Sequence, residues 1–156
     1  MCSSDLTKTA PNPDSTDLYF QGMALVNSGV ATLETLEQAR GFFVRALALD
    51  ASNVDAMVGL SYVDFNEASA WLVEDRTAHY AAAEATLNKV FAVAPNNASA
   101  HVWMGLVLNG TNRAPRALAE FDRALTLDPN LAYAYGLRAQ SLIFLGRADE
   151  VEFQVN

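Results

Sequence analysis

The chain contains very little cysteine and lysine, and these shortages exclude several kinds of site. Cys2 is the only cysteine among 156 residues, and Lys8 and Lys89 are the only lysines. A single cysteine excludes an internal disulfide and a multi-cysteine metal centre. The charge is acidic, with 18 Asp and Glu against 10 Lys and Arg and a formal net charge of −8. Because Lys and Arg contacts to phosphate supply most non-specific affinity for nucleic acid, this balance disfavours nucleic acids and anionic membranes as partners.

Signatures of catalysis are also missing from the sequence. His79 and His101 are the only histidines, and neither has a Cys, His or Asp pair at the sequence spacing of a metal site. Gly105 lies near a helix end without the remaining residues of a phosphate-binding loop. No apolar run approaches the ~20 residues of a membrane-spanning helix, and no secretory segment is visible. We expect a cytoplasmic protein that is not an enzyme, with no catalytic, cofactor-binding or metal-binding residues.

The sequence does contain a repeat with a period of 34 residues. The first copy has Ala83, Leu87, Val90 and Pro95, and the second has Ala117, Phe121, Ala124 and Pro129. In a packed helix pair, the small residue lets two helices approach, the larger residue four positions later fills the space, and proline ends the helix. This pattern resembles the tetratricopeptide repeat (TPR). The resemblance implies an all-α solenoid of antiparallel helix pairs, with about three to four units.

The remaining units depart from this regular pattern. Upstream, Ala39, Phe43 and Ala46 form a third copy that lacks the closing proline. Val90 follows Ala46 by 44 residues, so the second unit is ten residues longer than the period. We expect the insert within residues 65–79, as a lengthened leading helix followed by a short irregular loop. A last unit is expected to begin at residue 132, turn at residue 146 and end in its second helix at residue 156.

Residues 1–22 are interpreted as an expression-tag-like leader, and residues 23–156 as the repeat domain. The segment LYFQG at residues 18–22 resembles a tag-cleavage site, with Thr16 and Asp17 where Glu and Asn would stand. The alternative is a native disordered arm. At the other end, Val151, Phe153 and Val155 have no following helix to cover them. We expect either a fragment of a longer protein or a homodimer formed through this uncovered end.

The TPR resemblance also implies a concave groove that binds a peptide or a partner helix. Transferred residue by residue, the peptide groove comprises Asp55, Val58, Tyr62, Phe65, Asn66, Ser99, Val102, Leu106, Asn109, Tyr133, Gln140, Ile143 and Phe144. TPR domains that hold acidic chaperone tails carry Lys and Arg on this face, whereas the corresponding positions here are Val58, Tyr62, Val102, Leu106, Gly136 and Gln140. We therefore expect a neutral or apolar ligand, held by stacking and amide hydrogen bonds. Alternatively, the insert folds across the groove and buries some of these residues. Trp71 and Trp103 could line a pocket, although aromatic residues of amphipathic helices more often belong to the core.

A narrower resemblance covers nearly the whole repeat region. An early unit, an insert containing EDR at residues 74–76 and then two regular units resemble the TPR region of bacterial adenylate/guanylate cyclase-like regulators. In that family the region follows a cyclase or DNA-binding module, which implies a sensory or assembly role. Two functions stay open: a protein-interaction module, and a regulatory or oligomerisation segment of a multidomain cyclase-like or transcriptional regulator.

Overall fold

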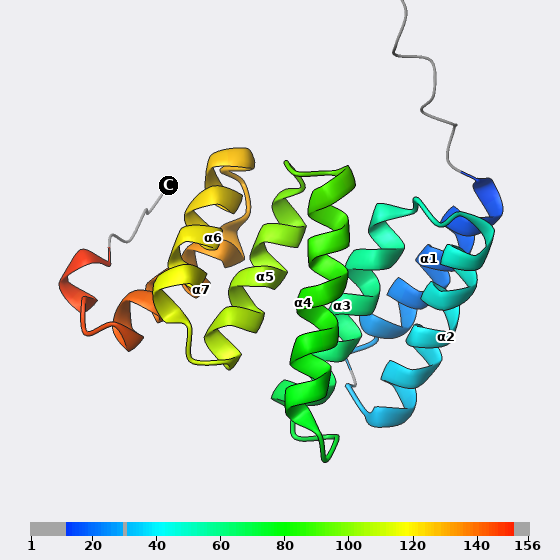
Figure 1. Cartoon of the computed structure of the whole chain (residues 1–156), viewed down its shortest axis with the longest axis horizontal. Helices are drawn as coiled ribbons and strands as arrows, with labels where there is room; N and C mark the ends of the chain where they lie inside the picture. The colour runs from blue at the N-terminus through cyan, green and yellow to red at the C-terminus, as the bar shows by residue number, and fades with distance from the viewer. Residues whose placement is uncertain (1–11, 30, 152–156) are drawn as a thin grey trace, which may run out of the picture.

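The helices follow one another along the long axis of the molecule in the computed structural model (Figure 1). The structure describes residues 12–29 and 31–151. Within these ranges the α-helices are α1 (Pro13–Val26), α2 (Leu33–Leu49), α3 (Val54–Ser69), α4 (Arg76–Val93), α5 (Ala98–Gly110), α6 (Ala114–Leu127) and α7 (Ala132–Phe144). A short 3₁₀ helix, η1, spans Ala148–Glu150, and the described residues contain no β-strand.

The helices form antiparallel pairs, and the leading helix of each pair lies on the inner side of the array. α1 packs on α2, α3 on α4, and α5 on α6, while α7 begins a fourth unit. The leading helices α1, α3, α5 and α7 each contact the next leading helix. Among the described residues, the following helices α2, α4 and α6 have no such contact with one another. The leading helices therefore converge on a concave face, and the predicted TPR-like solenoid is confirmed.

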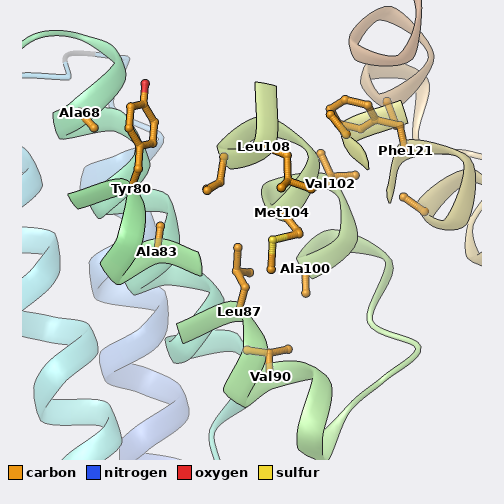
Figure 2. Packing of buried hydrophobic residues seen from close by; sticks show 14 residues of the cluster. Ala68, Tyr80, Ala83, Leu87, Val90, Ala100, Val102, Met104, Leu108 and Phe121 are labelled. Carbon is orange, nitrogen blue, oxygen red and sulfur yellow. The ribbon is translucent and has the colours of Figure 1, made fainter. Parts of the chain in front are cut away.

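The repeat anchors form the core of this array. All three small-large-small sets have no exposed surface: Ala39, Phe43 and Ala46; Ala83, Leu87 and Val90; and Ala117, Phe121 and Ala124. Figure 2 shows the α4 anchors facing Ala100, Met104 and Leu108 of α5. Each unit therefore buries its apolar face against its neighbour, as expected in a solenoid.

Three of the leading helices begin with the same cap. The side-chain carbonyls of Asn12, Asn53 and Asn97 accept hydrogen bonds from backbone N–H groups in the first turns of α1, α3 and α5. An asparagine in this position satisfies a donor that the helix itself leaves unpaired. Leu131 stands at the equivalent place before α7 and makes no side-chain cap.

The ten extra residues of the second unit are distributed over both of its helices and the loop between them. α3 has 16 residues against 13 in α5, and α4 has 18 against 14 in α6. The loop between α3 and α4 spans residues 70–75, three more than the loop between α5 and α6. The predicted longer leading helix and loop are present, whereas the extra turn of α4 was not predicted. In this loop, Trp71 has a positive φ of 59° and lies 75% exposed under the guanidinium of Arg76.

The boundary predicted after residue 22 falls inside α1. Residues 13–26 form one helix, in which Leu18 is 8% exposed and packs with Ala46 of α2. Residues 13–22 therefore supply most of the first leading helix of the described array. The interpretation of these residues as an expression-tag-like leader stays a prediction from the sequence.

The last unit is shorter than predicted within the described residues. The chain turns at Gly146, which has a φ of +71°, a backbone conformation that glycine adopts without strain. Among the described residues that follow, Ala148–Glu150 form the 3₁₀ helix η1, and residues 152–156 of the predicted second helix lie outside the described part of the chain. Phe153 and Val155, predicted as an uncovered apolar end, lie outside the described residues.

Candidate functional site

A small pocket opens on the concave face between α1, α3 and α5. Its volume is about 210 Å³. The lining residues are Tyr19 and Met23 of α1, Asp55, Val58, Gly59 and Tyr62 of α3, the cap residue Asn97, and Ser99 and Trp103 of α5. Small-molecule sites have volumes of about 300–1,000 Å³. This pocket is smaller, and its size fits one side chain of a longer ligand.

Aromatic contacts build one wall of the pocket. The rings of Tyr62 and Trp103 meet edge to face, with centroids 4.9 Å apart, and Phe65 lies 5.8 Å from Trp103. Burial raises the pKa of the Tyr62 hydroxyl, which stays neutral under ordinary conditions. Trp103 thus packs against its neighbours and also lines the pocket. The three rings therefore pack against one another to form this wall.

The opposite end of the pocket is polar. Asp55 is exposed in the first turn of α3, and Ser99 lies in the first turn of α5. Burial raises the pKa of Tyr19, and the nearby charge of Asp55 adds to this effect. No other described residue forms a hydrogen bond or ion pair with the Asp55 side chain. The carboxylate of Asp55 is therefore available to a ligand.

The structure brings together some of the predicted groove residues and separates others. Asp55, Val58, Tyr62 and Ser99 line the pocket, while Phe65, Asn66 and Leu106 are half-buried elsewhere on α3 and α5. Tyr133, Gln140, Ile143 and Phe144 are exposed on α7.

Two predicted groove residues are engaged inside the protein. Val102 has no exposed surface and belongs to the core, so the prediction that it contacts a ligand is wrong. It faces inward because α5 packs on both α4 and α6. Asn109 donates a 2.8 Å hydrogen bond from Nδ2 to Ser141 Oγ and so links α5 to α7.

Five lining residues were not among the predicted groove positions. They are Tyr19, Met23, Gly59, Asn97 and Trp103. The sequence places Tyr19 in the leader-like segment and favours a core position for Trp103. One sequence signal could have identified the pocket. Asp55 and Ser99 lie in the first turns of consecutive leading helices, and each is followed on the same helix by an aromatic residue, Tyr62 or Trp103.

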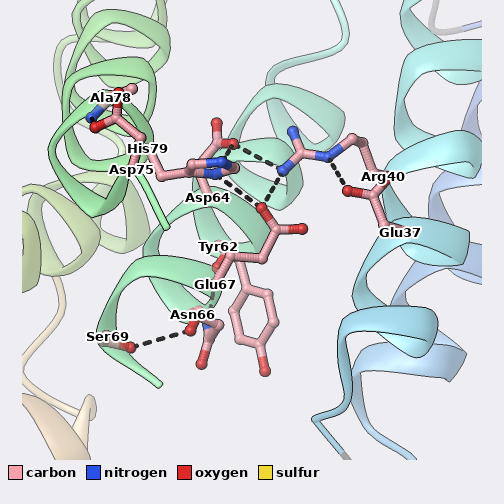
Figure 3. Close-up of polar contacts among 10 residues, drawn as sticks. All are labelled: Glu37, Arg40, Tyr62, Asp64, Asn66, Glu67, Ser69, Asp75, Ala78 and His79. Carbon is pink, nitrogen blue, oxygen red and sulfur yellow. Dashed lines mark hydrogen bonds and ion pairs between the residues drawn. The ribbon is translucent and has the colours of Figure 1, made fainter. Parts of the chain in front are cut away.

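A second polar cluster lies away from the pocket, where α2, α3 and α4 meet (Figure 3). The Arg40 guanidinium donates from one nitrogen to Asp64 Oδ1 at 2.8 Å and to Glu67 Oε2 at 2.6 Å. His79 Nδ1 lies 2.8 Å from Glu67 Oε2, outside hydrogen-bonding geometry. Glu67 has no exposed surface. Burial raises the pKa of Glu67, and the charges of Arg40 and His79 offset only part of this effect.

This cluster occupies a position that is apolar in the other units. Asp64 precedes Leu108 by 44 residues, and Leu108 precedes Leu142 by 34, which matches the lengths of the two units. Both leucines are buried. An acidic residue at a leucine position of the repeat is therefore the sequence signal for the cluster, although its partners lie on two other helices.

The cluster has the residue types of a metal site. Asp64, Glu67 and His79 each offer a ligand atom, and these atoms lie within 4.8 Å of one another. Arg40 bonds to both carboxylates and supplies the positive charge between them. We therefore interpret the cluster as an ion-pair network that joins three helices. The absence of metal-binding residues stays a prediction from the sequence.

The other histidine has structural partners on both ring nitrogens. His101 Nδ1 lies 2.6 Å from Glu120 Oε2, and Nε2 lies 3.0 Å from the carbonyl oxygen of Pro95. The ring stacks on Phe91. His101 thus connects α5 to α6 and to the preceding turn.

No helix in the described part of the chain combines the length and apolarity needed to cross a bilayer.

Comparison with known proteins shows the fold and no family. No protein-family model matches the chain, and no curated protein sequence does. The resemblance to cyclase-like regulators therefore stays a prediction. Among solved structures, MamA 41-end from Desulfovibrio magneticus RS-1 has a TM-score of 0.66 and 22% identity, covering 88% of this chain and 70% of that one. Another structure of MamA has a TM-score of 0.65 and 18% identity, covering 90% of this chain and 74% of that one. The chain therefore shares with MamA a TPR-like fold built from pairs of helices.

Proposed function

We propose that this chain is a protein-interaction module that holds an extended peptide or a partner helix along its concave face. The observation that carries the proposal is the pocket, because three leading helices line it and two packed aromatic rings form one wall. The sequences of α1, α3 and α5 contain no Lys or Arg. A ligand gripped by its carboxylates is therefore disfavoured, and stacking and backbone hydrogen bonds are the expected contacts. The low cysteine content fits the proposed cytoplasmic location.

The binding face continues from the pocket onto α7. Tyr133 is 51% exposed, and its hydroxyl lies near the side chain of Ser99, a lining residue of the pocket. A peptide that enters the pocket can therefore continue across Tyr133 toward Gln140. This path uses half-buried or exposed residues of all the described leading helices.

Site-specific photo-crosslinking tests the proposal. A photoreactive amino acid in place of Tyr133 should give a discrete protein adduct in native lysate, and Tyr62→Ala should reduce its yield. The matched control places the same group at Val44, which is 51% exposed on the outer helix α2. Equal adducts from both positions, or adducts unaffected by Tyr62→Ala, would contradict binding in the groove.

A second candidate function is assembly through the end of the array. Ile143 and Phe144 are 58% and 62% exposed near the end of α7. Apolar side chains at the end of a solenoid need a capping element or a partner. We propose that this end pairs with a second copy, whereas the sequence analysis placed such pairing at Val151, Phe153 and Val155. Light scattering tests this proposal: the double variant Ile143→Gln and Phe144→Gln should be monomeric at concentrations where the parent is dimeric, and a monomeric parent would refute it.

A further inference from the structure

We propose that the pocket between α1, α3 and α5 receives an arginine side chain of the bound peptide. This inference rests on the proposed function and specifies the chemistry of one ligand position. It differs from the expectation of a neutral or apolar ligand, because Asp55 would bind a charged side chain.

The charges around the pocket favour a cationic ligand group. Asp55 is the only charged residue in the lining. Among the leading helices, Arg138 of α7 is the only Lys or Arg, and its Nε donates to Asp122 Oδ1 at 2.6 Å. Asp55 thus has no cation of its own chain beside it within the described residues. A carboxylate at the mouth of a pocket without basic residues favours a cationic group.

The helix dipole does not remove this charge. Asp55 lies in the first turn of α3, where a carboxylate complements the partial positive charge of the helix end. That partial charge is about half of an elementary charge. A net negative charge therefore remains at the polar end of the pocket.

The aromatic wall distinguishes arginine from other cations. Tyr62 and Trp103 lie on the same side of the pocket and hold each other in place. A guanidinium is planar, stacks on aromatic rings and can donate two hydrogen bonds to one carboxylate. Its aliphatic stem would lie against Met23 and Val58. One arginine side chain therefore matches the size, wall and charge of the pocket together.

Nuclear magnetic resonance titration of the full chain tests the inference with defined probes. The probes are N-acetyl-Gly-Arg-Gly-amide and the same tripeptide with citrulline, which keeps the shape of arginine but has no charge. Binding should shift the indole N–H of Trp103 and the amide of Gly59, while the indole of Trp71, outside the pocket, should stay unchanged. We expect the arginine peptide to bind about five- to thirtyfold more tightly than the citrulline peptide.

Two variants locate the source of this selectivity. Asp55→Asn should lower the affinity for the arginine peptide to that of the citrulline peptide. Glu34→Gln, in the first turn of α2 and outside the pocket, changes the net charge equally and should keep the selectivity. Equal affinity for the two peptides on the parent protein, or no shift of Trp103 with either, would overturn the inference without requiring any variant to fold.

The two proposals fail in different ways. If both tripeptides bind equally at Trp103, the groove still binds peptides and only the arginine assignment is lost. If arginine selectivity is measured but crosslinking from Tyr133 gives no partner, the pocket assignment stands and the proposed function is refuted.

Discussion

The ring of Phe121 occupies the space into which a side chain on Gly105 would project. A Cβ atom on Gly105 would lie 2.6 Å from Phe121 Cε1 and 2.7 Å from Cζ. Gly105 is in α5, Phe121 is in α6, and both are buried. The third helix pair can therefore approach this closely only because residue 105 has no side chain.

This contact predicts opposite effects for one substitution at two helical glycines. Gly105→Ala should reduce the free energy of unfolding by about 1–3 kcal/mol, because the added methyl overpacks a filled site. At Gly136 of α7, a Cβ would meet nothing within 4 Å. Gly136→Ala should therefore stabilise the protein by about 0.5–1 kcal/mol. Urea unfolding measures both, and changes of the same sign would refute the assigned packing.

The ion-pair network of Arg40, Asp64, Glu67 and His79, called here the Arg40 network, predicts a large loss of stability when Arg40 is replaced. Arg40→Met would leave Asp64 and Glu67 buried without the guanidinium, which should cost about 3–5 kcal/mol. The matched control is Arg123→Met, because Arg123 is exposed and, among the described residues, bonds only to Asn96 on the surface. Its effect should stay within about 0.5 kcal/mol. Thermal unfolding measures both variants, and equal losses of stability would contradict the assigned role of Arg40.

We expect Glu84 to make a pH-dependent contribution to the stability of the fold. The Arg113 guanidinium donates to Glu84 Oε1 at 3.0 Å and to Oε2 at 2.6 Å, and these bonds lower the pKa of Glu84. A carboxyl with a lowered folded-state pKa stabilises the fold above its unfolded pKa, and this stability disappears as the pH falls through the folded pKa.

Glu84→Gln should therefore reduce the free energy of unfolding by about 0.5–1 kcal/mol at neutral pH, since the pair is partly exposed. The difference from the parent should vanish below the lowered pKa of Glu84. Urea unfolding of both proteins from neutral to acid pH checks this, and a difference that is constant across the range would be inconsistent with the ion pair.

The first helix predicts that residues 13–22 contribute to stability whatever their origin. Ser15 Oγ donates to the carbonyl oxygen of Ala46 at 2.8 Å and accepts from Asn53 Nδ2 at 2.8 Å. A chain beginning at Met23 would lose these bonds and the packing of Leu18, and the burial of one leucine is worth about 2–5 kcal/mol. Its melting temperature should fall below that of a chain beginning at Asn12. Equal melting temperatures would show that α1 is dispensable.

The repeat architecture could be predicted because each anchor position has a local packing role. Ala117, Phe121 and Ala124 recur at a fixed period, and a shared period implies a shared environment. The pocket and the Arg40 network could not be predicted in this way, because each is completed only when side chains from three helices come together. Tyr19 also lies in a segment that resembles a tag, and its packing depends on α2 rather than on its own sequence.

The ten-residue extension of the second unit has a consequence for cooperativity. Arg40 ties α2 to the extended α3, and His79 adds α4 to the same buried network. Solenoid units can open separately where their interfaces are weak. The first two units should therefore open together as one cooperative block in amide hydrogen exchange, while α7, at the end of the array, exchanges earlier and independently.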